Sequence, residues 1–154
     1  MVFLWKRYIL IVLMLLAGLV GVWAAALPRS FHDDFPGGGR SWVAAAGPYS
    51  EHLIRDVGTL SLALAVLTAA AVVRPRWVHP AVVAAAWLTY SVPHLLFHLV
   101  NDRHLATSDR WLSLAALALE VVLPLLLLTP TERTGDPVTV GGAGSGLSGR
   151  GRTR

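Results

Sequence analysis

The chain has 154 residues, of which 55% are hydrophobic and only 14% are charged, whereas soluble domains carry about 25% charged residues. So few charged groups do not cover the surface of a short soluble protein, and a disordered chain would be far poorer in apolar residues. The formal net charge of +4 comes from basic residues that are dispersed or flank apolar runs, which argues against a nucleic-acid-binding protein. The absence of cysteine excludes disulfides, iron–sulfur clusters, thiolate zinc sites and c-type haem. This composition predicts a small integral membrane protein.

The first apolar segment, about residues 8–27, contains no charged residue, follows Lys6 and Arg7, and is closed by Pro28. Its start also resembles a secretory signal, with the small residues 24–26 as a cleavage site. The apolar part of such a signal is about 7 to 15 residues long, whereas this run is long enough to cross about 30 Å of hydrocarbon. We therefore interpret it as the first membrane helix.

Residues 28–50 form a long outer loop in this interpretation, with a histidine and two acidic residues at 32–34 before three consecutive glycines. Several aromatic side chains give the loop apolar anchors. Ser41 to Ala46, followed by Gly47, has the pattern of a short capped helix that lies on the bilayer surface.

Three further apolar segments have helix signals at their ends. Residues 51–73 follow Ser50, a suitable N-cap, and stop before an Arg-Pro pair. Residues 80–100 begin at Pro80, which suits a first helical turn, and residues 109–128 end before another proline. With the first segment, they predict an all-α integral membrane bundle of four transmembrane helices.

The distribution of basic residues predicts the orientation. Positive charges are preferentially retained in the cytoplasm, and placing the N-terminus inside puts eight Lys and Arg residues on that side and five outside. Both termini are then cytoplasmic, and the chain is a multi-pass plasma-membrane protein. Residues 131–154, rich in Gly, Ser and Arg, are predicted to be a disordered cytoplasmic tail.

Polar residues within membrane helices are costly, so their helical phase indicates which face meets protein. In residues 80–100 the polar and aromatic residues recur at spacings of three and four, and shorter stripes occur in residues 51–73 and 109–128. Antiparallel packing brings these stripes to similar depths in the outer half of the bundle. The sequence thus predicts an outward-opening polar pocket, its mouth covered by the 32–34 loop, whose candidate residues are His52, Arg55, Asp56, Tyr90, His94, His98, Asp109 and Glu120.

The first interpretation of this pocket is a metal or haem site. His94 and His98 are one turn apart on one face, and His52 and Asp56 repeat that spacing on the preceding helix. Three imidazoles and a carboxylate would suit a transition metal such as zinc, copper or iron. Alternatively, one histidine from each of two facing helices would ligate a b-type haem.

Two other interpretations stay open. In the second, Arg55 or a histidine recognises a small polar or lipid-like molecule and a carboxyl group or a histidine transfers protons; a protonated Glu120 paired with Tyr90 fits a low dielectric. In the third, the same residues are ordinary helix pairs and interhelical hydrogen bonds in a non-catalytic structural or accessory subunit of a larger membrane complex. His79 is interpreted as structural, and His32 and His104 as loop residues. No phosphate loop, nucleotide fingerprint or nucleophile elbow assigns an enzyme class.

The stretch YSEHLIRDVG at residues 49–58, continued by a Leu- and Ala-rich helix, resembles the second-helix signature of small DoxX-like bacterial membrane proteins of actinobacterial type. It covers about a tenth of the chain. The resemblance implies a four-helix bundle in a bacterial plasma membrane and a family that mostly has no assigned reaction.

Overall fold

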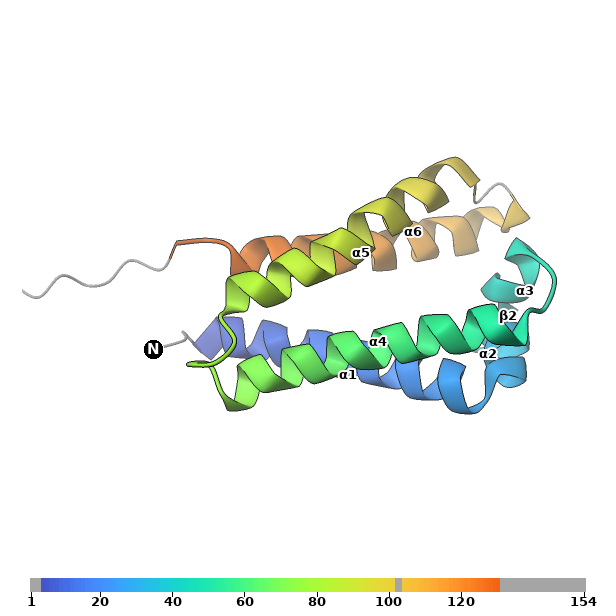
Figure 1. Ribbon diagram of the computed structural model, residues 1–154. Helices are drawn as coiled ribbons and strands as arrows, with labels where there is room; N and C mark the ends of the chain where they lie inside the picture. The colour runs from blue at the N-terminus through green and yellow to red at the C-terminus, as the bar shows by residue number, and fades with distance from the viewer. Residues whose placement is uncertain (1–3, 102–103, 131–154) are drawn as a thin grey trace, which may run out of the picture.

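The computed structural model describes residues 4–101 and 104–130 (Figure 1). The predicted all-α architecture is confirmed, with four long helices: α1 (Leu4–Ala26), α4 (Glu51–Val73), α5 (Pro80–Asn101) and α6 (Thr107–Leu127). Residues 28–50, here called the connector, join α1 to α4 and contain α2 (Pro28–Asp34), β1 (Pro36–Gly37), β2 (Arg40–Ser41) and α3 (Trp42–Ala46). The predicted tail at 131–154 lies outside the described residues.

Proline residues set several helix ends. Pro28 lacks a backbone N–H and begins α2 after a single intervening residue, Leu27. α4 ends before Pro75, as expected because the residue before a proline is disfavoured in helical conformation. α1 begins four residues earlier than the sequence indicates, so that Lys6 lies within the helix instead of ahead of it.

The connector is more ordered than the predicted loop. α3 coincides with the helix expected at its C-terminal part, whereas α2 was not predicted. β1 and β2 pair antiparallel across a two-residue turn at Gly38 and Gly39, whose φ angles of 65° and 76° are the positive values that this tight turn requires. The result is a small folded unit across one end of the bundle, here called the connector end (Figure 1).

The four long helices form two hairpins, α1 with α4 and α5 with α6. Glycines allow α1 and α4 to pack backbone against backbone. A Cβ added to Gly21 would lie 2.8 Å from Leu62 Cγ, and one added to Gly58 would overlap the backbone of Ala24 and Ala25. Such small-residue contacts are typical of helix pairs in membranes, where close packing replaces the hydrophobic effect.

The two hairpins meet at the end of the bundle opposite the connector and diverge toward the connector end (Figure 1). Their shared core includes Leu10, Leu13, Val83 and Trp87. The Trp87 indole donates a 3.0 Å hydrogen bond to the Thr68 hydroxyl, which joins α5 to α4. This polar link is buried, so it fixes the rotation of the two helices relative to each other.

Lys6 makes a second link between the hairpins. Its Nζ donates to the Leu127 carbonyl at 2.9 Å and to the Thr129 carbonyl at 2.7 Å. These carbonyls lie at the C-terminus of α6, where they have no partner within the helix and where the helix dipole favours a positive charge. The charge therefore holds the start of α1 against the end of α6.

Large apolar side chains cover the outside of the bundle, among them Leu19, Val66 and Val100, each about two-thirds exposed. All four long helices have the length and hydropathy needed to cross a bilayer. An apolar surface of this extent is stable in lipid and not in water. The chain is therefore an integral, multi-pass membrane protein.

Candidate functional site

The polar face predicted for residues 80–100 lies on the connector-end half of α5. Here Tyr90, His94 and His98 follow one another at one-turn intervals. The ring centroids of Tyr90 and His94 are 5.1 Å apart, and those of His94 and His98 are 4.8 Å apart. The Nε2 atoms of the two histidines are 3.1 Å apart, and all three side chains are partly buried. We call these three residues the α5 ladder.

Glu120 of α6 lies at the deep end of the α5 ladder, close enough to Tyr90 for the two groups to interact electrostatically. Its Oε2 atom is buried and has no hydrogen-bond partner among the described residues. The fully buried Ser91 hydroxyl on α5 is in the same situation. Tyr90 and Glu120 are thus near each other in the α5–α6 hairpin, and their role as a pair in a binding pocket stays a prediction.

His52 and Asp56 do not join this group. They form a pair on α4, with His52 Nε2 3.3 Å from Asp56 Oδ2, and their side chains are 90% and 52% exposed. The opposite face of α4, which includes Ile54 and Gly58, packs against α1. Because His52 lies two residues before Ile54, it is turned about 200° around the helix axis and points away from α1.

Arg55 contacts protein backbone instead of an open pocket. Its guanidinium donates to the carbonyl of Ala25 and, at 2.9 Å, to Glu51 Oε1. Ala25 is in the last turn of α1, where carbonyl groups have no helical partner. Arg55 thus holds the C-terminus of α1 to the first turn of α4, and its role in ligand recognition stays a prediction.

Asp109, in the first turn of α6, binds the connector. Its Oδ1 accepts a 3.0 Å bond from Arg40 Nε at the start of β2. This ion pair joins the α5–α6 hairpin to the connector on the side of the bundle where the two hairpins diverge (Figure 1).

The four predicted metal ligands are therefore divided between two places, His52 with Asp56 on α4 and His94 with His98 on α5. Within residues 4–101 and 104–130, no group of three or more His, Asp or Glu side chains is arranged to hold a metal ion. The haem arrangement needs histidines from two facing helices, whereas the hairpins that carry His52 and His94 meet at the other end of the bundle. The predicted ligands are thus brought together as two separate pairs, one on α4 and one on α5.

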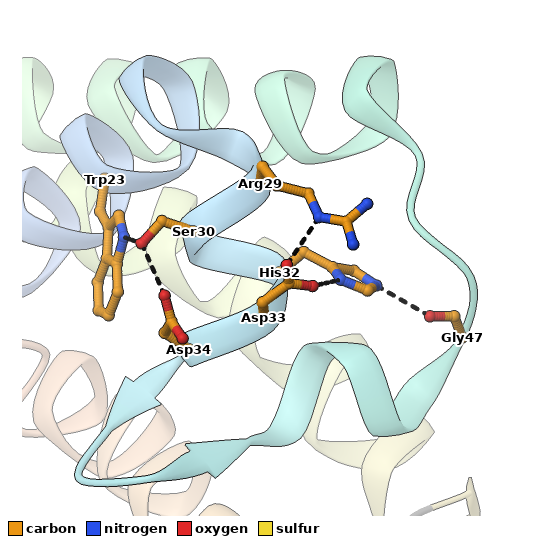
Figure 2. Close-up of polar contacts among 7 residues, drawn as sticks. All are labelled: Trp23, Arg29, Ser30, His32, Asp33, Asp34 and Gly47. Atoms are coloured by element: carbon orange, nitrogen blue, oxygen red, sulfur yellow. Dashed lines mark hydrogen bonds and ion pairs between the residues drawn. The ribbon is translucent and has the colours of Figure 1, made fainter.

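A second polar cluster, not predicted as a site, lies in the connector (Figure 2). His32 of α2 is buried, with Nδ1 2.7 Å from Asp33 Oδ1 and Nε2 3.1 Å from the Gly47 carbonyl oxygen. Arg29 Nε donates to Asp33 Oδ2 at 2.7 Å. The sequence predicts this histidine to be a loop residue over the pocket mouth, whereas the structure places it within a helix. The useful signal was Pro28 as a helix start, which places Arg29 and Asp33 one turn apart.

This arrangement affects the charge of the Asp33 carboxyl group. Hydrogen bonds from His32 and Arg29 hold the pKa of Asp33 below its ordinary value.

Ser30 on the same helix accepts from the Trp23 indole at 3.3 Å and donates to Asp34 at 3.0 Å. The connector is thus tied to itself and to α1 by polar contacts as well as by its aromatic side chains.

Comparison with known proteins identifies no relative: no family model, no curated protein and no solved structure matches the chain. The resemblance to DoxX-like proteins stays a prediction from residues 49–58. The α5 ladder and the connector are the two polar clusters whose geometry bears on function.

Proposed function

We propose that this protein resides in the plasma membrane and binds a divalent transition-metal ion of the zinc or copper class through His94 and His98. The observation that supports the proposal most directly is the 3.1 Å separation of the two Nε2 atoms. With metal–nitrogen bonds of about 2.0 to 2.1 Å, two nitrogens at this separation would subtend roughly 100° at a shared ion. That angle lies between octahedral and tetrahedral values.

The place of the pair in the membrane helix also supports ion binding. At about 1.5 Å rise per residue, His98 and His94 lie roughly 5 and 10 Å from the end of α5 at Asn101. This depth is shallow enough for an ion to enter from the aqueous phase. Placing two polar side chains inside an apolar membrane helix costs free energy, so residues of this kind are usually functional.

Two protein ligands leave other positions of the ion open for solvent or for a small molecule. Open positions are typical of metal sites that bind or activate a ligand, whereas structural sites are closed by four protein ligands. Tyr90 and Glu120 extend the site inward as a hydroxyl and a carboxyl group. They are suited to bind the polar part of such a ligand.

Metal binding by the full chain in detergent tests the proposal. The purified protein is titrated with Zn²⁺ and with Cu²⁺, and the copper-loaded form is examined by electron paramagnetic resonance. We expect one ion per chain and couplings from two imidazole nitrogens. His94→Ala and His98→Ala should each remove that signal.

His52→Ala is the matched control, because His52 also lies one turn from a potential ligand but is exposed on α4. It should leave the stoichiometry and the spectrum unchanged. Retention of the bound ion by both α5 variants, or its loss in His52→Ala alone, would overturn the assignment.

A further inference from the structure

Figure 2 shows His32 held between two oxygen atoms. The protonation state of the imidazole decides whether one or both of its nitrogens can donate a hydrogen bond to them. Nδ1 faces a carboxylate oxygen of Asp33, and Nε2 faces the carbonyl oxygen of Gly47. An ionised carboxylate and a backbone carbonyl are both acceptors only. The ring therefore satisfies both contacts only when both nitrogens carry a proton, which is the imidazolium form.

Each neutral tautomer loses one contact. A proton on Nδ1 alone keeps the bond to Asp33 and directs the Nε2 lone pair at the Gly47 oxygen. A proton on Nε2 alone keeps the bond to Gly47 and directs the Nδ1 lone pair at the carboxylate. Because His32 is buried, water does not easily replace the lost contact.

The charged side chains nearest to His32 are those of Asp33 and Arg29. On α2, the Asp33 carboxylate accepts from His32 and from Arg29. The Tyr49 ring, just before α4, meets the His32 ring edge-on at 5.4 Å and lies under the Arg29 guanidinium at 4.9 Å.

The remaining elements packed here add no free charge among their described residues. α3 carries no ionisable side chain, the connector half of α1 is uncharged, and Arg40 of β2 pairs with Asp109 of α6. On α2 itself, the Asp34 carboxylate accepts a hydrogen bond from Ser30. In the first turns of α4, Glu51 and Arg55 bond to each other, and His52 and Asp56 form an exposed pair.

We propose that His32 is a protonation-dependent clasp that fastens the connector, by joining α2 to the segment between α3 and α4. Protonation of His32 from the aqueous phase at the connector end completes both hydrogen bonds and holds the connector more tightly. Loss of the proton releases one of them. The stabilisation is therefore present at mildly acidic pH and declines as the pH rises. This device is independent of metal binding at His94 and His98.

The position of the clasp gives it a consequence for the whole bundle. Arg40, which pairs with Asp109 of α6, is in the connector between α2 and α3. The connector is thus attached to both hairpins at the end where they diverge. Loosening the clasp weakens the attachment of α6 to the α1–α4 hairpin.

Hydrogen–deuterium exchange of the full chain in detergent or nanodiscs, corrected for intrinsic exchange rates, tests the proposal between pH 5 and pH 8. We expect amides in residues 28–50 to open roughly three- to tenfold more often at the higher pH, the effect of one hydrogen bond of ordinary strength. Nitrogen-15 spectra of labelled histidine should show His32 as an imidazolium over the protected range.

Three variants complete the test. His32→Gln removes the titrating group and should abolish the pH dependence. Asp33→Asn keeps an acceptor oxygen beside Nδ1 but removes the negative charge, so the transition should move to lower pH. His52→Gln, in an exposed His–Asp pair, should behave as the unmodified chain. Equal protection of the connector at both pH values, or an unchanged transition in Asp33→Asn, would overturn the proposal.

Discussion

The close contact of Gly58 with α1 predicts that a larger residue at this position destabilises the fold. A Cβ at this position would overlap the Ala25 backbone nitrogen and lie 2.9 Å from the Ala25 Cα atom. Both contacts are with main chain, so a side-chain rotation does not relieve them and α1 and α4 must separate. Overpacking of this kind costs about 1–3 kcal/mol, while alanine gains up to about 1 kcal/mol of helix propensity over glycine. Gly58→Ala should therefore destabilise the fold by about 1–2 kcal/mol.

Gly18→Ala is the matched control, because a Cβ on Gly18 meets no atom within 4 Å. It gains the helix propensity without the overlap, so it should equal or slightly exceed the stability of the unmodified chain. Reversible unfolding in mixed micelles, followed by circular dichroism, measures the free energy of unfolding of each variant. If Gly58→Ala were as stable as Gly18→Ala, the close packing of α1 on α4 described above would be refuted.

Three other predictions concern single polar groups. Lys6→Met should lower the free energy of unfolding by about 1–3 kcal/mol in the same assay, because it removes a charged donor from the last carbonyls of α6; no change would contradict the contact. Trp87→Phe should cost about 1–3 kcal/mol through the lost bond to Thr68 and the lost volume of the buried indole, and a similar loss on combining it with Thr68→Val would show that the two groups act as one pair. Because bonds from His32 and Arg29 lower the pKa of Asp33 from 3.8, the ionised carboxylate stabilises the folded connector at pH values above 3.8, and this contribution is lost as the pH falls further. Amide exchange in residues 28–50 should then accelerate in strong acid, and an Asp33→Asn chain should not show that acceleration.

Much of the helical architecture could be predicted because its signals are local. Apolar length and prolines mark the ends of α4 and α5. Lys6 shows where local reasoning stops. As a charge beside an apolar run it indicates orientation, but its contact with the end of α6 spans 121 positions in the chain and depends on how the hairpins assemble.

The candidate site was predicted in part for the same reason. The spacing of His94 and His98 is a property of one helix, so their proximity follows from helix geometry alone. Whether His52 and Asp56 converge on this pair depends on how α4 is rotated about its own axis. That rotation is set by the contact of α4 with α1. The absence of a side chain at Gly58 lets that face of α4 pack closely on α1. His52 lies on a different face of the same helix and is therefore exposed.

The role of His32 in the connector depends on which hydrogen-bond donors and acceptors surround it in the fold. Sequence alone presents His32 as one histidine among turn formers, whereas the fold places it between a carboxylate and a carbonyl group. Aromatic burial by Phe31 and its neighbours would hold the connector on the bundle without any titrating group. A buried histidine with two acceptors therefore adds pH dependence to a contact that hydrophobic packing already supports, and pH should change how tightly the connector is held without unfolding the four helices.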